Sequence, residues 1–247
     1  MSIAFVTVAT GGTYNNGGPF DTASDAFVAT AGNLIVACVN INDVDDATPS
    51  NVTMTDTAGN TYTRSLHGIN GATNKGQMLF YATNILGHAT NVVTAHTTST
   101  AGYMDVIAIQ FSGVTTSSPL DASPAVTNSY NVAGPLSTGT FSTVQADEVA
   151  VAFIQSSNQG GSNDFTAGSG YTIPSGGKAK YPSESEYTMA VQYQVFASTQ
   201  SSVTASMDFT GSASSRSVTL GLLTFKAAAG GSSTSTGMGL LTVGIGR

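Results

Sequence analysis

Four strand-length runs in the first half of the sequence recur in the second half after a nearly constant interval. The intervals lie between 111 and 115 residues. The matching runs are Leu34–Ala37 with Val149–Ala152, Gln77–Tyr81 with Thr188–Gln192, Asn91–Ala95 with Ser202–Ser206, and Val106–Phe111 with Thr219–Phe225. Self-similarity at a fixed spacing is typical of a chain in which one structural unit occurs twice. The sequence therefore predicts an internal repeat of about 110 residues.

These runs have the character of β-strands. They are short, rich in β-branched and aromatic residues and bounded by Gly, Asn, Asp and Pro, whereas no segment shows the three-and-four apolar spacing of a helix. The strands expected in the first half are Ile3–Val8, Leu34–Ile41, Val52–Thr55, Thr61–Ser65, Gln77–Thr83, Val92–Thr97 and Met104–Phe111. Residues 56–60 predict a turn in which Gly59 adopts a positive φ. We expect an all-β protein.

The size of each repeat suits a β-sandwich, either two immunoglobulin-like sandwiches or two halves of one jelly-roll-like sandwich. Composition divides the chain into a first repeat (1–116), a linker (117–136), a second repeat (137–226) and a flexible linker with an apolar tail (227–247). Strand alternation predicts a core made of Ile35, Cys38, Leu79, Tyr81, Ile107, Ile109, Val151, Phe153, Val191, Leu220 and Leu222.

Charge is scarce, because Asp, Glu, Lys and Arg make up 9% of the 247 residues. The net charge is -7 and the seven basic residues form no stripe, which argues against nucleic acid as a partner. No run is long and apolar enough for a membrane span, and the first residues show no secretory signal, so we expect synthesis in the cytoplasm. Cys38, the single cysteine, lies within an apolar run, which predicts a small buried side chain.

Histidine and serine patterns give little support for catalysis. His67 and His88 have loop-like neighbours and His96 lies in a strand-like run, and none belongs to an H-x-H or H-E-x-x-H pattern. Gly168-Ser169-Gly170 lacks the G-x-S-x-G spacing of a nucleophile elbow. We therefore expect no catalytic residue, no cofactor and no enzyme.

Oxygen-rich segments and tyrosines are the remaining candidates for binding sites in the sequence. Glu184 and Glu186 are two residues apart, which leaves no room for a sugar between them. Residues 40–46 offer up to five oxygen side chains to calcium but lack the glycine and distal glutamate of an EF-hand, so we expect a polar loop and no metal. Glycan-binding surfaces rely on flat aromatic rings, especially Trp, and this chain has no Trp. Its tyrosines in loop-like or edge contexts are Tyr14, Tyr130, Tyr171, Tyr181 and Tyr187.

Four segments together resemble a group of mostly uncharacterised β-sandwich proteins of tailed bacteriophages and bacteria. They are Thr30–Val36, Thr55–Tyr62, Phe80–Ala82 and Ile109–Val114. The likeness covers about residues 25–115, with a weaker echo through Lys226, and its motifs describe strands and turns. The phage members imply a virion component, either a capsid decoration (cement) protein or a fibre-associated module. The resemblance carries over no catalytic residue.

Residues 237–247 are apolar and have no counterpart in the repeat. Because exposed apolar segments are a liability, they either pack on their own domain or dock on a neighbouring subunit through Leu240, Leu241, Val243 and Ile245. We expect a non-enzymatic capsid decoration protein located in the virion. Its partners would be the major capsid protein or other virion subunits, with homo-oligomers as its assembly state. The alternative is a receptor- or glycan-binding module of a fibre or adhesin.

Overall fold

The computed structural model describes most of the 247-residue chain. The described residues are 2–15, 18–42, 51–70, 75–99, 102–121, 125–130, 134–157, 164–180, 187–210 and 217–229. They form antiparallel β-sheets throughout, which confirms the all-β prediction. Among them no helix is long and apolar enough to cross a membrane.

The first half builds a five-stranded and a three-stranded sheet, called inner sheet 1 and outer sheet 1. Inner sheet 1 has the order β1 (Ala4–Asn15), β10 (Gly102–Ser112), β4 (Leu34–Asn42), β7 (Lys75–Ala82) and β6 (Thr63–Asn70). Outer sheet 1 has the order β2 (Phe20–Ala23), β9 (Val93–Thr97) and β5 (Val52–Asp56), and a separate pair joins β3 (Phe27–Ala29) to β8 (His88–Asn91). After β5, Gly59 has a φ of 80° and its N–H bonds to the carbonyl of Asp56, as the turn prediction requires.

The second half builds the same pair of sheets. Inner sheet 2 has the order β11 (Ala125–Tyr130), β18 (Ser217–Lys226), β13 (Glu148–Ser157), β16 (Met189–Phe196) and β15 (Lys178–Ala179). Outer sheet 2 has the order β12 (Leu136–Ser137), β17 (Ser206–Phe209) and β14 (Phe165–Ala167). Matched position by position, β4 and β13 both take the central place of an inner sheet. The strand orders thus correspond, while superposition of the two halves remains the test of the repeat itself.

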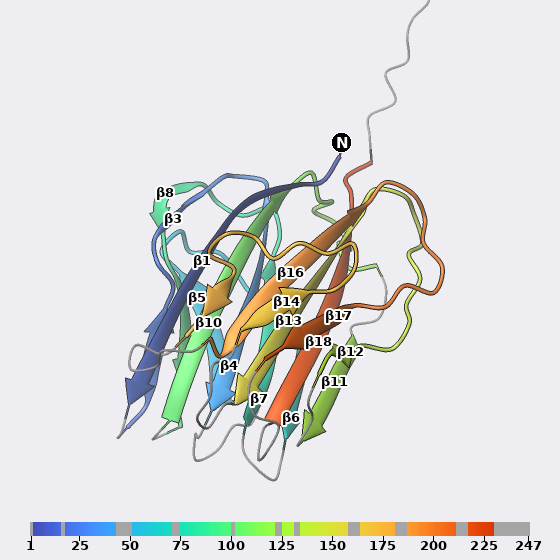
Figure 1. The fold of residues 1–247 in the computed structure, drawn as a ribbon. Coiled ribbons are helices and arrows are strands. Elements are labelled where there is room, and N and C mark those ends of the chain that lie inside the picture. Colours follow the sequence, from blue (N-terminus) through green and yellow to red (C-terminus); the bar gives the residue numbers. More distant parts are fainter. Residues whose placement is uncertain are drawn as a thin grey trace, which may run out of the picture.

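The two inner sheets pack face to face, so the molecule has four layers (Figure 1). Across this interface β1 lies against β15, β10 against β16, β4 against β13, β7 against β18, and β6 against β11. Exchanging each strand for its counterpart in the other half reproduces the same set of contacts. The strand contacts across the interface are therefore symmetric in strand order, with β4 and β13 at the centre.

Three hydrophobic clusters fill the spaces between the layers. On β4, Leu34 and Val36 face the other inner sheet, whereas Ile35 and Ala37 face the outer sheet of their own half, and all four are fully buried. Alternation of buried and exposed side chains was expected. It occurs in the outer strands but is wrong for the central strands of the inner sheets, because a sheet covered on both faces is apolar on both.

The residues expected in the core are all buried except Tyr81, which is partly exposed. Within the expected linker, residues 117–136, the structure places strand backbone. This segment contains β11, which pairs with β18 at the edge of inner sheet 2, and the first residue of β12. The start of the expected tail also pairs, because Ala227 bridges to Val114 and the Ala228 N–H bonds to the Gly113 carbonyl. Residues 230–247 lie outside the described residues.

Candidate functional site

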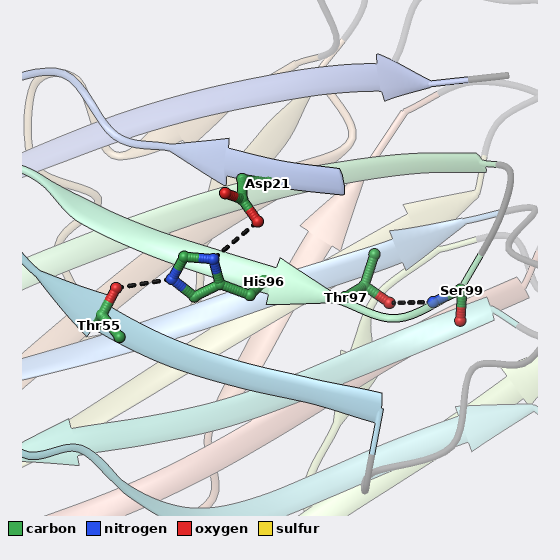
Figure 2. A network of polar contacts seen from close by, with 5 residues as sticks. All are labelled: Asp21, Thr55, His96, Thr97 and Ser99. Atoms are coloured by element: carbon green, nitrogen blue, oxygen red, sulfur yellow. Dashed lines mark hydrogen bonds and ion pairs between the residues drawn. The ribbon is translucent and has the colours of Figure 1, made fainter. Parts of the chain in front are cut away.

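Three side chains on the outer face of outer sheet 1 form a chain of hydrogen bonds (Figure 2). His96 Nδ1 lies 2.7 Å from Asp21 Oδ1, and His96 Nε2 lies 2.7 Å from Thr55 Oγ1. When the neutral imidazole carries its proton on Nδ1, it donates to Asp21 and accepts from the Thr55 hydroxyl. A carboxylate, an imidazole and a hydroxyl are thus linked in the order of a hydrolytic triad.

The register of the sheet brings these residues together. His96 on the central strand β9 is directly opposite Asp21 on β2 and Thr53 on β5. Thr55 lies two residues beyond Thr53, so it projects on the same face of the sheet. The sequence analysis placed His96 in a strand, but its partners lie 75 and 41 residues away along the chain, and sequence reasoning did not find them.

The surroundings of this triad-like arrangement do not favour catalysis. The side chain of Asp21 is 61% exposed and that of His96 is 35% exposed, so the group lies on an open sheet face. An oxyanion hole needs N–H groups that converge beside the nucleophile, whereas extended backbone sends successive N–H groups to opposite sides. We interpret Asp21, His96 and Thr55 as a polar tie across three strands, called the cross-strand tie below.

The other sequence candidates do not converge on one place. His67 lies in β6 and His88 begins β8, where its Nδ1 accepts a hydrogen bond from the Thr90 N–H. Both had been assigned to loops. Gly168–Gly170 forms a turn closed by the Tyr171 N–H, so Ser169 has no elbow geometry. Glu184, Glu186 and residues 43–46 lie outside the described residues, among which no group of three His, Cys, Asp or Glu side chains is arranged to hold a metal.

Asp105 is a fully buried carboxyl between the inner sheets, and sequence reasoning missed it. Its Oδ2 accepts hydrogen bonds from Asn40 Nδ2 at 3.1 Å and from the Thr188 hydroxyl across the interface. Burial raises the pKa of Asp105 to about 7, although these two hydrogen bonds act in the opposite direction. The available signal was a lone acidic residue in the apolar run Met104–Phe111, which marks a buried carboxyl more often than a loop.

A second acidic site lies where the chain leaves inner sheet 2. Burial and a hydrogen bond with the Asp121 carboxyl raise the pKa of Glu148 to about 8. The backbone N–H groups of Val144 and Gln145 donate to Asp121 and Glu148, respectively. Glu148 is paired in the sheet with Lys226, the last residue of β18. The carboxyls of Asp121 and Glu148 thus accept the backbone N–H groups of residues 144 and 145 beside the end of β18.

Strand β1 borders an open pocket of about 430 Å³. Among the described strands β1 pairs with β10 alone. Its other edge approaches β2 near Gly11 and lies beside β3, and the Thr10 carbonyl accepts the Asp25 N–H. Val6 on β1 and Val28 on β3 line this pocket and are 40% and 61% exposed. We call this surface the β1 edge. It combines unpaired strand backbone with exposed apolar side chains.

A second pocket, of about 580 Å³, opens between the edge strands β14 and β15 of the second half. It adjoins the first pocket at Gly176, which lines both. Tyr187, one of the tyrosines singled out in the sequence, lies at this pocket beside Lys178. Tyr171, by contrast, is buried, and Tyr14 stacks on Tyr103 at the far end of β1.

Comparison with models of protein families, with curated proteins and with solved structures finds no match to this chain.

Proposed function

We propose that this chain is a non-enzymatic structural protein that assembles on neighbouring subunits, as a capsid decoration or cement protein does in a virion. The observation that supports this proposal best is the β1 edge. A strand edge with unpaired backbone is a template for another strand, and natural proteins usually protect such edges with charge, proline or a covering loop. Here Val6 and Val28 make the edge apolar instead.

The rest of the molecule suits a scaffold. Both faces of each inner sheet are buried, and three hydrophobic clusters fill the spaces between the four layers. The surface carries few charges, because only 9% of all residues are charged. Each contact with a neighbour therefore requires little desolvation of charged groups, which is otherwise a large cost of association.

The partner that we propose for the β1 edge is the apolar segment 237–247 of a neighbouring copy. The described chain ends at residue 229, after Ala228 has bonded to Gly113. Gly113 lies in turn against the backbone of Ser2, just before β1 begins. Eleven extended residues span about 35 Å at roughly 3.3 Å per residue, which is long enough to follow β1 on an adjacent subunit. Strand addition would pair the backbone and bury alternate side chains among Leu240, Leu241, Val243 and Ile245.

The test compares three variants with the full chain. Deletion of residues 230–247 should leave the thermal midpoint unchanged and reduce self-association, measured by analytical ultracentrifugation, and incorporation into purified particles, measured by mass spectrometry. Val6→Lys should reduce both in the same way, because it places a charge on the β1 edge. Val195→Lys is the matched control, since Val195 is 39% exposed on a different sheet and Val6 is 40% exposed.

Two outcomes would refute this proposal. One is a truncated chain that unfolds at a lower temperature while the full chain is monomeric, which would place the segment in its own core. The other is equal association of the Val6→Lys and Val195→Lys variants, which would leave the β1 edge without a role. A copy number of hundreds per particle supports decoration, whereas about a dozen supports a fibre.

A further inference from the structure

The pocket between β14 and β15 has the lining of a small polar-ligand site. Its volume of about 580 Å³ lies within the range of roughly 300–1,000 Å³ that small-molecule sites occupy. The side chains that give it chemical character are Asp164, Thr166, Ser175, Lys178 and Tyr187. They supply hydroxyls, one carboxylate, one ammonium group and one aromatic ring. None of them belongs to the β1 edge.

Asp164 is held firmly at the entrance to this pocket. Its backbone N–H donates to the Thr210 hydroxyl at 2.9 Å, and its carbonyl accepts the Thr210 N–H at 3.0 Å. Its Oδ1 accepts the Phe165 N–H at 2.8 Å and forms an ion pair with the Lys178 ammonium group. The ion pair lowers the pKa of Asp164, so the carboxylate is ionised at neutral pH. The side chain is nevertheless 59% exposed, and Oδ2 takes no hydrogen bond from the described residues.

Lys178 connects this carboxylate to an aromatic ring. Its Nζ lies 5.4 Å from the centroid of the Tyr187 ring, and its side chain is 24% exposed. Tyr187 itself is 36% exposed, so part of its ring surface is accessible. The three groups therefore lie next to each other, with ring, ammonium and carboxylate all accessible from the same opening.

We propose that this pocket binds a neutral oligosaccharide through one pyranose ring. The apolar C–H face of the sugar would pack on the face of the Tyr187 ring that Lys178 does not cover, as flat rings allow at little entropic cost. Neighbouring hydroxyls would donate to Asp164 Oδ2 and accept from Lys178, and charge-assisted hydrogen bonds of this kind are the stronger ones. Because the charges of Asp164 and Lys178 cancel, the pocket favours a neutral ligand over a sialylated or phosphorylated one.

This inference adds a recognition function to a chain proposed above as a scaffold, and each can fail without the other. The experiment titrates the full chain with maltotriose, cellotriose, chitotriose and N-acetyllactosamine, and with 3′-sialyllactose as an anionic counterpart. Binding is measured by isothermal titration calorimetry and by ligand-observed saturation-transfer NMR. We expect at least one neutral probe to bind and sialyllactose to bind more weakly.

Variants then locate the binding. Tyr187→Ala should lower the affinity for the best-binding neutral probe by at least about tenfold. Tyr187→Phe should retain this affinity because the aromatic ring remains. Asp164→Ala should weaken binding as well. Tyr14→Ala is the matched control, since Tyr14 is 48% exposed and lies outside both pockets. Thermal melting confirms that each variant is folded.

The inference is overturned if no neutral probe binds at millimolar concentration, or if sialyllactose binds best. It is also overturned if Tyr14→Ala and Tyr187→Ala weaken binding equally, or if Tyr187→Phe loses binding as completely as Tyr187→Ala. None of these results depends on self-association, so they leave the scaffold proposal to its own test.

Discussion

Substitution of Asp105 by asparagine should make the protein more stable at pH 8 and not at pH 5. Asp105 is fully buried, and its pKa rises from 3.8 to about 7 on folding. The folded state therefore binds a proton that the unfolded state releases between these values. Wherever the folded state binds more protons, the free energy of unfolding falls as pH rises. The contribution of Asp105 to the free energy of unfolding is fully present below about pH 4 and is lost progressively as the pH rises to about 7.

The size of this effect follows from the difference in pKa. Each pKa unit is worth about 1.36 kcal/mol, so ionised Asp105 costs the folded state on the order of 4 kcal/mol above pH 7. Asparagine keeps one oxygen to accept from Asn40 and Thr188, but it places an amide nitrogen where Oδ1 has no hydrogen-bond partner. An unsatisfied buried donor costs about 1–3 kcal/mol. We therefore expect Asp105→Asn to gain about 1–3 kcal/mol at pH 8. At pH 5, where the wild type has already lost roughly 1.7 kcal/mol of the Asp105 contribution, the variant should lie within about 1.5 kcal/mol of the wild type.

The assay is urea unfolding of both proteins at pH 5 and pH 8, with the difference between them compared at the two pH values. Glu148, whose pKa is raised to about 8, gives the wild-type curve a slope of the same sign. It contributes equally to both proteins, so the difference isolates Asp105. Asp208→Asn, on the exposed side of β17, should change stability by less than about 0.5 kcal/mol at either pH. An Asp105→Asn effect of the same sign and size at both pH values would refute the reasoning.

Three further perturbations test the packing and the cross-strand tie. Phe153→Ala removes a fully buried ring from the interface between the inner sheets and should cost about 3–5 kcal/mol in urea unfolding, against less than about 0.5 kcal/mol for the exposed Val195→Ala. A cost below about 1 kcal/mol would mean that the halves do not pack this way. Gly11→Ala would place Cβ 1.9 Å from the Ala23 carbonyl oxygen and should lower stability by at least about 1–3 kcal/mol, whereas Gly139, with nothing within 4 Å, should tolerate alanine. Equal midpoints for the two variants would contradict the close approach of β1 to β2. His96→Ala removes the cross-strand tie and should cost less than about 1 kcal/mol, because the tie is exposed. Hydrolysis of p-nitrophenyl acetate by the native chain that disappears in His96→Ala would instead show that the tie is catalytic.

The amino-acid sequence was sufficient for the local features of this fold. Predominantly apolar runs such as Leu34–Ile41 and Met104–Phe111 are long strands because β-branched residues favour extended backbone. The turn after β5 follows from Gly59, whose positive φ costs a glycine nothing. Short strands were missed: β2, β3 and β8 have three or four residues each, too few for a period of two to stand out. The same holds for β12, and β11 was hidden by its Ser- and Asn-rich surroundings.

The candidate sites were decided by tertiary structure. The sequence identified His96 and Tyr187 as residues to consider, but nothing local pairs His96 with Asp21 and Thr55, or Tyr187 with Lys178 and Asp164. Such contacts depend on sheet register and on which edges meet.

The packing of inner sheet against inner sheet was likewise decided only in three dimensions. The sequence of a strand that is buried on both faces is the same whether a second sheet, a helix or another chain packs on its second face. The sequence therefore records that Leu34 and Ile35 are both hidden from water, but not that Leu34 is covered by the second half of the same molecule. That choice depends on the fit of two complete sheet faces, which no segment of sequence carries by itself.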